Sequence, residues 1–512
     1  MKISMLARRA ACLVAASTLL VSQALATWSI VVIDRSTGEV CVASATCLGN
    51  QFPLQRWLPV IVVGRGAAAA QSAIDNSAQN RMRIWNLMHA GATPKRILEQ
   101  LALHDGGHQS RQYGITSFDG PPVTFTGTGA GVAKLGVTGV VGSMEYAIQG
   151  NVLAGDPVIF EAEKALVNTQ GDLGQKVMAA MQAARFMGGD GRCSCNPADP
   201  PSCGSPPPNF TKSAHTVFIV LARMGDTDGV CDLTDGCANG NYYLLKFFNG
   251  KASGPDPMVV LRNKYANWRA NLGGIPDAIH SEVHIDRQQL VADGLSTARV
   301  VVVLRDVEGR ALVSGGDTLT VVPTTPGAPT AIPGPVTDHG DGTYSFDMLS
   351  TTTVGRGAWN LVVKYKPKKS AQLYPPMILA TTAVVDLHSG FYEYSIDTGT
   401  PIPFTLNRGM AESGRAYHLL GSFSGTSPGI DLGGLNLPLN RDRFFEYTWF
   451  SPGPPGLTGF QGMLDADGRA LAWLDMPTES WAVFVGERFD FCALLGGAIP
   501  EITQLVGFEV LP

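Results

Sequence analysis

A threonine stands at the point where the sequence predicts the end of an export signal. A positively charged start precedes an apolar run over residues 10–20, and the small residues Ala24 and Ala26 occupy the positions that a signal peptidase reads. Cleavage after Ala26 would leave Thr27 as the first residue of the mature chain. A free N-terminal threonine can be a nucleophile, because its own α-amine titrates at about pH 8 and can accept the hydroxyl proton. The alternative is a routine cleavage site that happens to be followed by threonine.

Eight of the nine cysteines lie beyond the predicted signal, because Cys12 would leave with it. They are Cys41, Cys47, Cys193, Cys195, Cys203, Cys231, Cys237 and Cys492. An even number in an oxidising compartment favours disulfides. Cys193, Cys195 and Cys203 could alternatively form part of a zinc site, but no histidine or second CxxC stands nearby at ligand spacing. The sequence therefore predicts disulfides and no metal site.

An acidic segment at 226–235 has two of these cysteines in or just after it. Its carboxylates, Asp226, Asp228, Asp232 and Asp235, resemble a calcium loop in composition, because hard cations prefer several oxygens close together. The spacing is not that of an EF-hand, and the closing glutamate is missing. We predict instead an acidic turn closed by a disulfide between Cys231 and Cys237.

Composition narrows the classes of protein that this chain can be. Its 512 residues suggest roughly three domains at about 100 to 200 residues each. The charged fraction is low at 16%, whereas glycine (59) and proline (33) are plentiful, a balance typical of extracellular proteins rich in β-structure and turns. With a net charge of -5 and no basic run, nucleic acid is not an expected partner. No apolar stretch after the signal is long enough to span a bilayer, so we expect a secreted, extracellular or periplasmic protein.

Apolar periodicity and turn residues predict alternating strands and helices in the first half. Expected strands are 28–33, 39–46, 58–63, 111–115, 123–127, 214–222 and 242–248, and expected helices are 67–88, 93–103, 157–169 and 173–187. This order suits an α+β domain over residues 27–275, with a central pair of antiparallel sheets and helices on both outer faces. The first two strands are apolar on both faces and are expected in the middle of the fold. Thr27 would then lie at the edge of a buried strand.

Six separated segments share a pattern with a known family. They are 27–39, 111–114, 125–127, 146–155, 188–192 and the residues Asp256, Pro257, Leu261 and Arg262. Together they resemble the family called domain of unknown function 1028. The resemblance implies a four-layer αββα sandwich of the N-terminal-nucleophile (Ntn) hydrolases, which cleave amide bonds, and it places the leading residue of the family on Thr27. The family has no settled substrate, so no particular reaction comes with the fold.

Three more residues of the matching segments are candidates for the same site. Asn151 could donate to an oxyanion, Asp190 could orient the Thr27 amine, and Arg192 could hold a substrate carboxylate. The alternative for Asn151 is a turn after Gly150, and the alternative for Asp190 and Arg192 is a mutual pair that fixes a loop. The predicted export and a cysteine-bearing insertion at 193–209 depart from the family pattern.

The second half of the chain is predicted to form β structure. Short strands at 298–304, 318–322, 343–348 and 359–365, separated by turn residues, predict a β-sandwich over 280–386. Its segments 338–345 and 357–361 resemble the immunoglobulin-like modules of bacterial surface proteins. Residues 388–512 are expected to form a further all-β module. A spacer followed by a terminal module suggests display, or binding of a carbohydrate or surface partner; the alternative is a purely structural appendage.

Two functions of different classes remain open from the sequence. The first is an exported Ntn-type hydrolase of a peptide or small-molecule amide, with Thr27 as nucleophile and no cofactor. The second is a secreted or surface binding protein in which the Ntn fold is not catalytic and the β modules carry the function. A fold does not by itself decide between them.

Overall fold

The computed structural model describes residues 27–325, 327, 329–366, 369–382, 386–450, 455–497 and 500–512. The signal predicted over residues 1–26 lies outside this range. The chain forms two compact units, Met1–Asn267 and Trp268–Pro512. The boundary between them falls inside α7 (Pro257–Ala270).

A six-stranded antiparallel sheet holds the first strand near its centre. The order is β10-β9-β2-β1-β8-β7. The strands are β1 (Thr27–Asp34), β2 (Glu39–Thr46), β7 (Leu135–Val141), β8 (Met144–Asn151), β9 (Thr216–Ala222) and β10 (Leu244–Asn249). β1 and β2 form the predicted hairpin, and their side chains are buried almost throughout. Because both faces of these strands are covered, both can be apolar.

A second, four-stranded antiparallel sheet packs against the first. Its strands, in spatial order, are β3 (Pro59–Val62), β4 (Gly66–Ser72), β5 (Arg111–Ser117) and β6 (Gly120–Thr126). β4 contacts β1 and β2, and β5 contacts β1 and β8. Between the sheets lies an apolar cluster that includes Val31, Ile33 and Val42 from the first sheet and Ala67 and Ala69 from the second.

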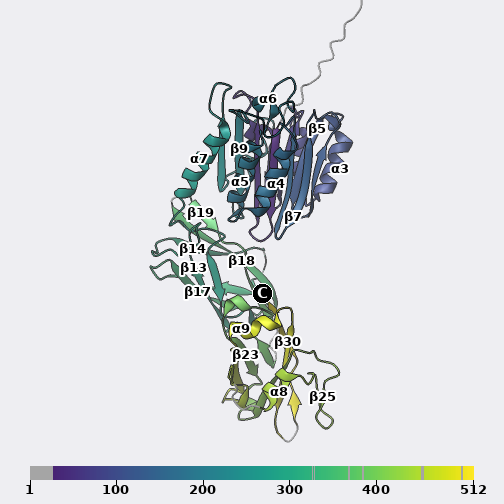
Figure 1. Ribbon diagram of the computed structural model, residues 1–512. Coiled ribbons are helices and arrows are strands. Elements are labelled where there is room, and N and C mark those ends of the chain that lie inside the picture. Colours follow the sequence, from purple (N-terminus) through teal and green to yellow (C-terminus); the bar gives the residue numbers. More distant parts are fainter. Residues whose placement is uncertain are drawn as a thin grey trace, which may run out of the picture. The chain divides into compact units, whose positions relative to one another are not determined.

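Helices cover the outer faces of both sheets, which completes four layers. α4 (Pro157–Asn168) and α5 (Leu173–Phe186) contact the first sheet, and α2 (Gln79–His89) and α3 (Pro94–His104) contact the second. Figure 1 shows α4 and α5 over one side of the unit and α3 on the other. Apart from α7, the other helices described in this unit are short: α1 (Leu54–Trp57), η1 (His108–Ser110) and α6 (Gly191–Ser194). An α+β architecture with paired sheets and outer helices was the expectation from element order.

The helix predicted over 67–88 is wrong over its first half. Residues Gly66–Ser72 form β4, and the helix begins only at Gln79. Alanine favours helices, but propensity is a weak determinant that tertiary context overrides. Here the small side chains of Ala67 and Ala69 allow β4 to lie buried against the first sheet. The predicted helix start at Thr93 is confirmed, since its side chain accepts a hydrogen bond from Arg96 N.

In the first unit, the strands β7 and β8 and the long helix α7 were not predicted, and neither were β4 as a strand or the short helices α1, η1 and α6. β7 and β8 form a hairpin, and β8 pairs with β1 along its whole length. Their glycine content and mixed polarity hide the strand pattern in the sequence. α7 lies in a segment that was recognised only by its family motif.

A partly buried ion pair anchors the segment 111–114. The Asp105 carboxylate accepts from Arg111 Nε at 2.8 Å, from Asn80 Nδ2 at 2.6 Å and from the backbone of Gly107 at 2.9 Å. Burial alone would raise the pKa of Asp105, but these hydrogen bonds lower it to about 2. The pair joins the end of α3 to the start of β5.

This pair predicts an acid-sensitive contribution to stability. Because the pKa of folded Asp105 lies below its ordinary value of 3.8, its contribution is fully present above that value and is lost as pH falls toward 2. The contribution is about 2 kcal/mol, since one pKa unit corresponds to about 1.4 kcal/mol. Asp105→Asn should therefore lower the free energy of unfolding near neutral pH and flatten its fall between about pH 5 and about pH 2.

Urea unfolding across this pH range measures the effect. Glu99→Gln on the same helix is the control, because Glu99 pairs only across an exposed surface with Arg96 and such pairs contribute little. A variant Asp105→Asn with the same acid dependence as the parent would contradict the assignment.

The second unit begins with a two-sheet β-sandwich. One sheet contains β11 (Glu282–Ile285), β13 (Thr297–Val303), β17 (Thr343–Ser350), β15 (Ala331–Pro333) and β16 (Thr337–Asp338). The other contains β12 (Gln289–Val291), β20 (Met377–Thr382), β18 (Gly355–Lys366), β14 (Thr318–Pro323) and β19 (Lys369–Gln372). Their facing side chains form one core, with Phe346 from the first sheet and Trp359 from the second. All four strands that the sequence predicted here are present.

The C-terminal module of this unit also has two sheets around a core rich in phenylalanine. One sheet contains β21 (Leu387–Ser389), β23 (Ile402–Asn407), β29 (Arg469–Leu474) and β27 (Leu457–Thr458). The other contains β22 (Glu393–Ser395), β32 (Val506–Leu511), β30 (Arg488–Leu495), β24 (Ala416–Ser422), β28 (Gln461–Met463) and β31 (Glu501–Ile502), and β25 (Ile430–Asp431) pairs with β26 (Asn436–Leu437). The expectation of a purely β module is wrong in one respect, because α8 (Arg443–Phe450) packs on β24. The other helical turns are α9 (Thr478–Trp481), η2 (Ile396–Thr398), η3 (Met410–Glu412) and η4 (Ala482–Phe484).

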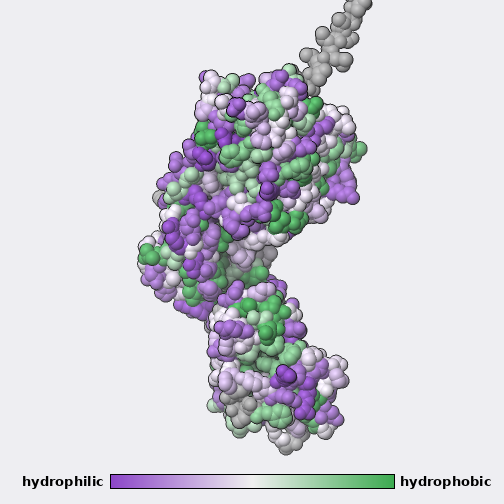
Figure 2. Space-filling model, in the orientation of Figure 1, coloured by the Kyte–Doolittle hydropathy of each residue, from purple (hydrophilic) through white to green (hydrophobic). Residues whose placement is uncertain are grey.

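Hydrophilic and hydrophobic residues are interspersed over the visible surface of both units (Figure 2). Within the described residues, no helix is both long enough and apolar enough to cross a membrane.

Candidate functional site

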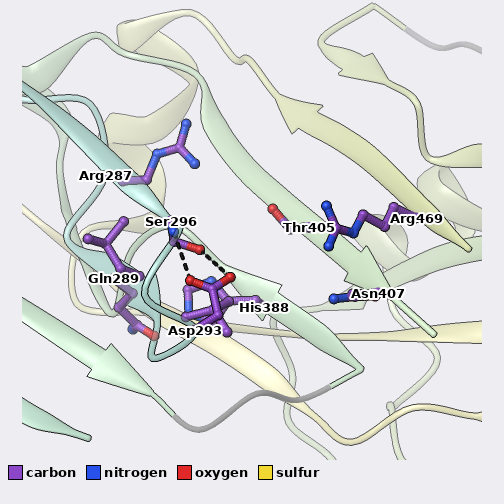
Figure 3. Close-up of a pocket in the computed structure, with 10 residues that line it drawn as sticks. Arg287, Gln289, Asp293, Ser296, His388, Thr405, Asn407 and Arg469 are labelled. Atoms are coloured by element: carbon purple, nitrogen blue, oxygen red, sulfur yellow. Dashed lines mark hydrogen bonds between the residues drawn. The ribbon is translucent and has the colours of Figure 1, made fainter. Parts of the chain in front are cut away.

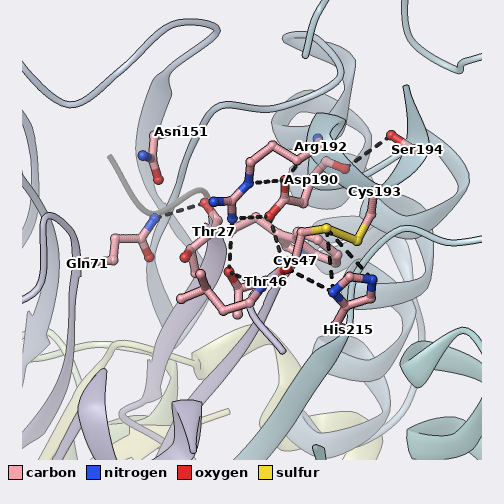
Figure 4. A network of polar contacts seen from close by, with 12 residues as sticks. Thr27, Thr46, Cys47, Gln71, Asn151, Asp190, Arg192, Cys193, Ser194 and His215 are labelled. Carbon is pink, nitrogen blue, oxygen red and sulfur yellow. Dashed lines mark hydrogen bonds and ion pairs between the residues drawn. A yellow bond between two sulfur atoms is a disulfide. The ribbon is translucent and has the colours of Figure 1, made fainter. Parts of the chain in front are cut away.

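Thr27 is the first residue of β1, and its side chain is 1% exposed in the chain that still carries residues 1–26. Its direct neighbour in the sheet is Asn151, the last residue of β8. Gln71 of the second sheet donates its Nε2 to the Thr27 carbonyl at 3.1 Å. Figure 4 shows Gln71 and Asn151 on one side of Thr27, and Asp190 and Arg192 on the other. Three predicted site residues therefore do surround the fourth.

The space between the sheets changes from apolar to polar toward Thr27. Side chains alternate along a strand, so Thr27 and Ser29 share a face with Val31 and Ile33, which belong to the inter-sheet core. Ser29 Oγ bonds to Ser44 Oγ at 3.0 Å and also to Gln71 Oε1.

Two glutamines extend this buried polar set. Gln71 Nε2 donates to Gln112 Oε1 at 2.8 Å, and Gln112 Nε2 reaches the carbonyl of Gly150 at 2.9 Å. Gln149, which pairs with Ser29, is fully buried and its amide has no partner among the described residues. We did not single out these residues from the sequence. The sequence feature that could have indicated them is a serine or glutamine at alternate positions in strands whose other residues are apolar.

Asn151 uses its amide nitrogen for internal contacts. Nδ2 donates to Ser72 Oγ at 3.3 Å and to the carbonyl of Ala130 at 3.0 Å. Its Oδ1 is buried and has no partner among the described residues. In this arrangement Asn151 offers the site an acceptor, and the oxyanion-donor role stays a prediction.

Two residues beside Thr27 have left-handed backbone conformations. Ser72, which follows Gln71, has φ 73°, and Val152, which follows Asn151, has φ 54°. A positive φ in a β-branched residue such as valine is unusual and costs energy. Strain of this kind persists where the surrounding structure imposes it, and it gathers at functional sites.

Asp190 and Arg192 form a bidentate pair. Arg192 donates Nε to Asp190 Oδ1 at 3.1 Å and Nη2 to Asp190 Oδ2 at 2.8 Å. Asp190 Oδ2 also accepts from Cys47 N at 2.6 Å, and Oδ1 accepts from Arg192 N at 3.1 Å. Asp190 is fully buried, so its charge depends on these four bonds. Both residues hold loops together, which was the alternative to their catalytic roles.

Backbone hydrogen bonds hold the loop around Asp190 against the residues that follow β8. Ala154 N donates to Gly189 O at 3.0 Å, and Gly191 N donates to Val152 O at 3.1 Å. Gly189 has φ 57°, and a Cβ there would lie 2.6 Å from the ring of Trp28. Only glycine therefore lets this loop bring Asp190 next to the start of β1.

A disulfide between Cys47 and Cys193 lies beside Asp190 (Figure 4). The ring of His215 lies against it, with Nδ1 3.7 Å from Cys47 Sγ, and burial lowers the pKa of His215. Among the described residues, Cys47, Cys193 and His215 are the only group of three or more metal-ligand side chains close enough to hold an ion. Because both sulfurs are in the disulfide, neither is available as a thiolate ligand.

Two further disulfides close local loops. The predicted pair Cys231–Cys237 is confirmed, and Cys195 is bonded to Cys203. An even count did not mean complete pairing, because Cys41 and Cys492 are buried free thiols in different units. Burial raises the pKa of Cys492 to about 12, which makes it inert as a nucleophile.

The acidic segment does not gather its carboxylates around one point. Asp226 accepts from the backbone of Arg223 and Tyr243, and Asp228 accepts from the backbone of Val63. Asp232 accepts from the backbone of Thr234 and Asp235. Asp232 therefore fixes its own turn, whereas Asp228 joins the segment to Val63 and Asp226 joins it to Tyr243.

The fold and the site define the class of this protein: an N-terminal α+β domain with a polar centre at Thr27, followed by β-sandwich modules. Residues 27–197 match the model of a family described as Family of unknown function (DUF1028), and residues 277–372 match that of Invasin, domain 3. The chain therefore carries a DUF1028 domain at 27–197. An invasin-type, immunoglobulin-like bacterial domain follows at 277–372, before the C-terminal module. Both resemblances are confirmed, although the first match ends at residue 197 and not near 275.

Solved structures similar to this chain include a DUF1028-family protein from Silicibacter pomeroyi, with 17% identity, a TM-score of 0.35, and coverage of 47% of this chain and 88% of that one. The adhesin InvE of Yersinia pseudotuberculosis has 18% identity and a TM-score of 0.18, over 45% of this chain and 58% of its own. Invasin, described as a bacterial integrin-binding protein, has 11% identity and a TM-score of 0.18, over 78% of this chain and 56% of its own. TM-scores this low do not by themselves establish a shared fold. No curated protein sequence matches the chain.

Proposed function

We propose that this chain is an exported binding protein of the adhesin kind, whose second unit contacts a partner on another surface. The observation that carries the proposal is the match of residues 277–372 to an invasin domain, in a segment that forms a two-sheet sandwich. Three disulfides support an oxidising location, either extracellular or periplasmic. We retain the proposed domains 27–275, 280–386 and 388–512 for this arrangement.

The contacts around Thr27 support binding over catalysis as the main function. Asp190 and Arg192 are engaged with each other, and Asp190 also accepts from Cys47 N. A catalytic group must reach its substrate, and side chains that are saturated by structural contacts are poorly placed for this.

Amide hydrolysis by an Ntn-type domain is the second candidate function. It is favoured by the left-handed Ser72 and Val152 beside Thr27, and by the unpartnered Oδ1 of Asn151 within the described residues. The four layers of the first unit suit the Ntn class. In this proposal the released amine of Thr27 is the base and its hydroxyl is the nucleophile.

A retention assay tests the main proposal. Beads coated with the mature chain, residues 27–512, are expected to stay on a panel of cell and matrix surfaces under washing that removes albumin-coated beads. Retention no greater than that of albumin on every surface would contradict the proposal.

A further inference from the structure

A polar cavity of ≈ 110 Å³ lies within the second unit, where the immunoglobulin-like module meets the C-terminal module. Its lining includes Arg287 and Asp293 of the first module and His388, Thr405, Asn407 and Arg469 of the second. Hydrogen bonds from Gln288 N and Gln289 N to Gly390 O, at 2.7 and 2.9 Å, tie the two modules together beside it. The cavity is therefore built by both modules (Figure 3).

Sheet register places four polar side chains on one wall. Thr405 and Asn407 are two residues apart in β23, so they share a face, and the intervening Leu406 belongs to the module core. His388 in β21 is the direct partner of Thr405, and Arg469 in β29 is the direct partner of Asn407. Direct partners project from the same face.

Positive charge dominates the lining. The guanidinium of Arg469 has no ion pair or hydrogen bond among the described residues, whereas Arg408 of the same module pairs with Asp386 and Glu501. Arg287 lies on the facing wall, and its Nε forms an ion pair with Asp286 at 3.6 Å.

The one carboxylate in the lining is already engaged. Asp293 accepts from Leu295 N at 2.8 Å, from Ser296 N at 2.7 Å and from the hydroxyls of Ser296 and Ser350. It fixes the turn between β12 and β13 and, within the described residues, forms no ion pair with either arginine of the lining. Figure 3 shows Arg287 and Arg469 as separate side chains on either side of Ser296 and Thr405.

His388 supplies an acceptor. It is 6% exposed, and its Nε2 has no partner among the described residues. Burial lowers the pKa of His388 to about 4, with a hydrogen bond to the backbone of Leu290 acting in the opposite direction, so the ring is neutral near neutral pH. A neutral, buried ring nitrogen without a hydrogen is satisfied by a hydroxyl donor.

We infer that this cavity binds a hydroxylated carboxylate, namely an acidic sugar unit of the uronate type. Its carboxylate would be met by Arg287 and Arg469, and its hydroxyls by His388 Nε2 together with Thr405 and Asn407. Guanidinium groups suit carboxylates because their donors match the two oxygens. The inference rests on the proposed binding function and gives it a ligand class: a glycan that carries a uronate.

Titration of the mature chain with D-glucuronate, followed by saturation-transfer NMR, tests the inference. D-Glucose lacks the carboxylate and acetate lacks the hydroxyls, so each should bind at least about tenfold more weakly than glucuronate. Equal affinity for all three probes, or no glucuronate binding at millimolar concentration, would overturn the inference.

Variants locate the binding. Arg469→Gln and Arg287→Gln should each weaken glucuronate binding at least about tenfold, because each removes charge-assisted hydrogen bonds. Arg441→Gln is the matched control, since Arg441 is an exposed arginine of the same module that pairs with Glu446. Thermal melting establishes that each variant folds. Arginine variants that fold and still bind glucuronate as the parent does would overturn the inference.

The proposed binding function and the proposed ligand class are contradicted by different results. Retention of coated beads on surfaces without glucuronate binding would remove the ligand class and leave the binding function. Glucuronate binding that depends on both arginines, without retention on any surface, would support the cavity and remove the adhesin-type function.

Discussion

Removing the disulfide between Cys47 and Cys193 is expected to destabilise the first unit by about 5 kcal/mol. The bond closes a loop of 146 residues, and in the chain-entropy model the stabilisation grows with the logarithm of loop length. It joins the end of β2 to α6, so it also holds the loop whose Asp190 accepts from Cys47 N. The double variant Cys47→Ala with Cys193→Ala should therefore unfold at markedly lower urea.

The local disulfide Cys195–Cys203 is the matched control. It closes a loop of only 8 residues, for which the same model gives about 2.5 kcal/mol. Urea unfolding of the mature chain, followed by hydrogen exchange in β2, measures both changes on the same element. Equal effects of the two removals would show that loop closure is not the source of the stabilisation.

Once an amide substrate of the first unit is found, adding one residue before Thr27 is expected to abolish its hydrolysis. The addition turns the α-amine into an amide, which cannot accept the proton of the hydroxyl. Thr27→Ala should abolish turnover as well, because it removes the hydroxyl. Both changes leave β1 and its pairing with β8 in place.

Thr27→Ser is the control for this prediction, since it keeps both the hydroxyl and the amine. It should retain part of the activity, as measured by initial rates against an amide panel. An extended chain that hydrolyses its substrate as fast as the mature chain would contradict the second candidate function.

The main architecture followed from sequence pattern because the strands and helices that define it are strongly patterned. The apolar runs of β1 and β2, and the turn residues between the strands of the second unit, predicted a buried hairpin and a β-sandwich. β4 was mistaken for a helix because alanine has no strong pattern in a strand, and only its neighbours β3 and β5 decide its conformation.

The residues of the candidate site could be named from the sequence, but their arrangement in space could not be predicted. Thr27 and Asn151 are adjacent because β8 pairs with β1, and β8 was not predicted as a strand. The engagement of Asp190 by Arg192 and Cys47 depends on loop contacts between residues far apart in the chain. The cavity at Arg287 and Arg469 depends on sheet register across two modules, which no local pattern indicates.

The central claim is that the second unit carries the function by binding, independently of Thr27. The most direct measurement is retention of beads coated with the mature chain or with Thr27→Ala, in the presence of antibody fragments directed against residues 27–267 or 268–512. The account predicts equal retention for the two coatings, and loss of retention only with the fragment against 268–512. Retention that Thr27→Ala removes, or that only the fragment against 27–267 blocks, would contradict it.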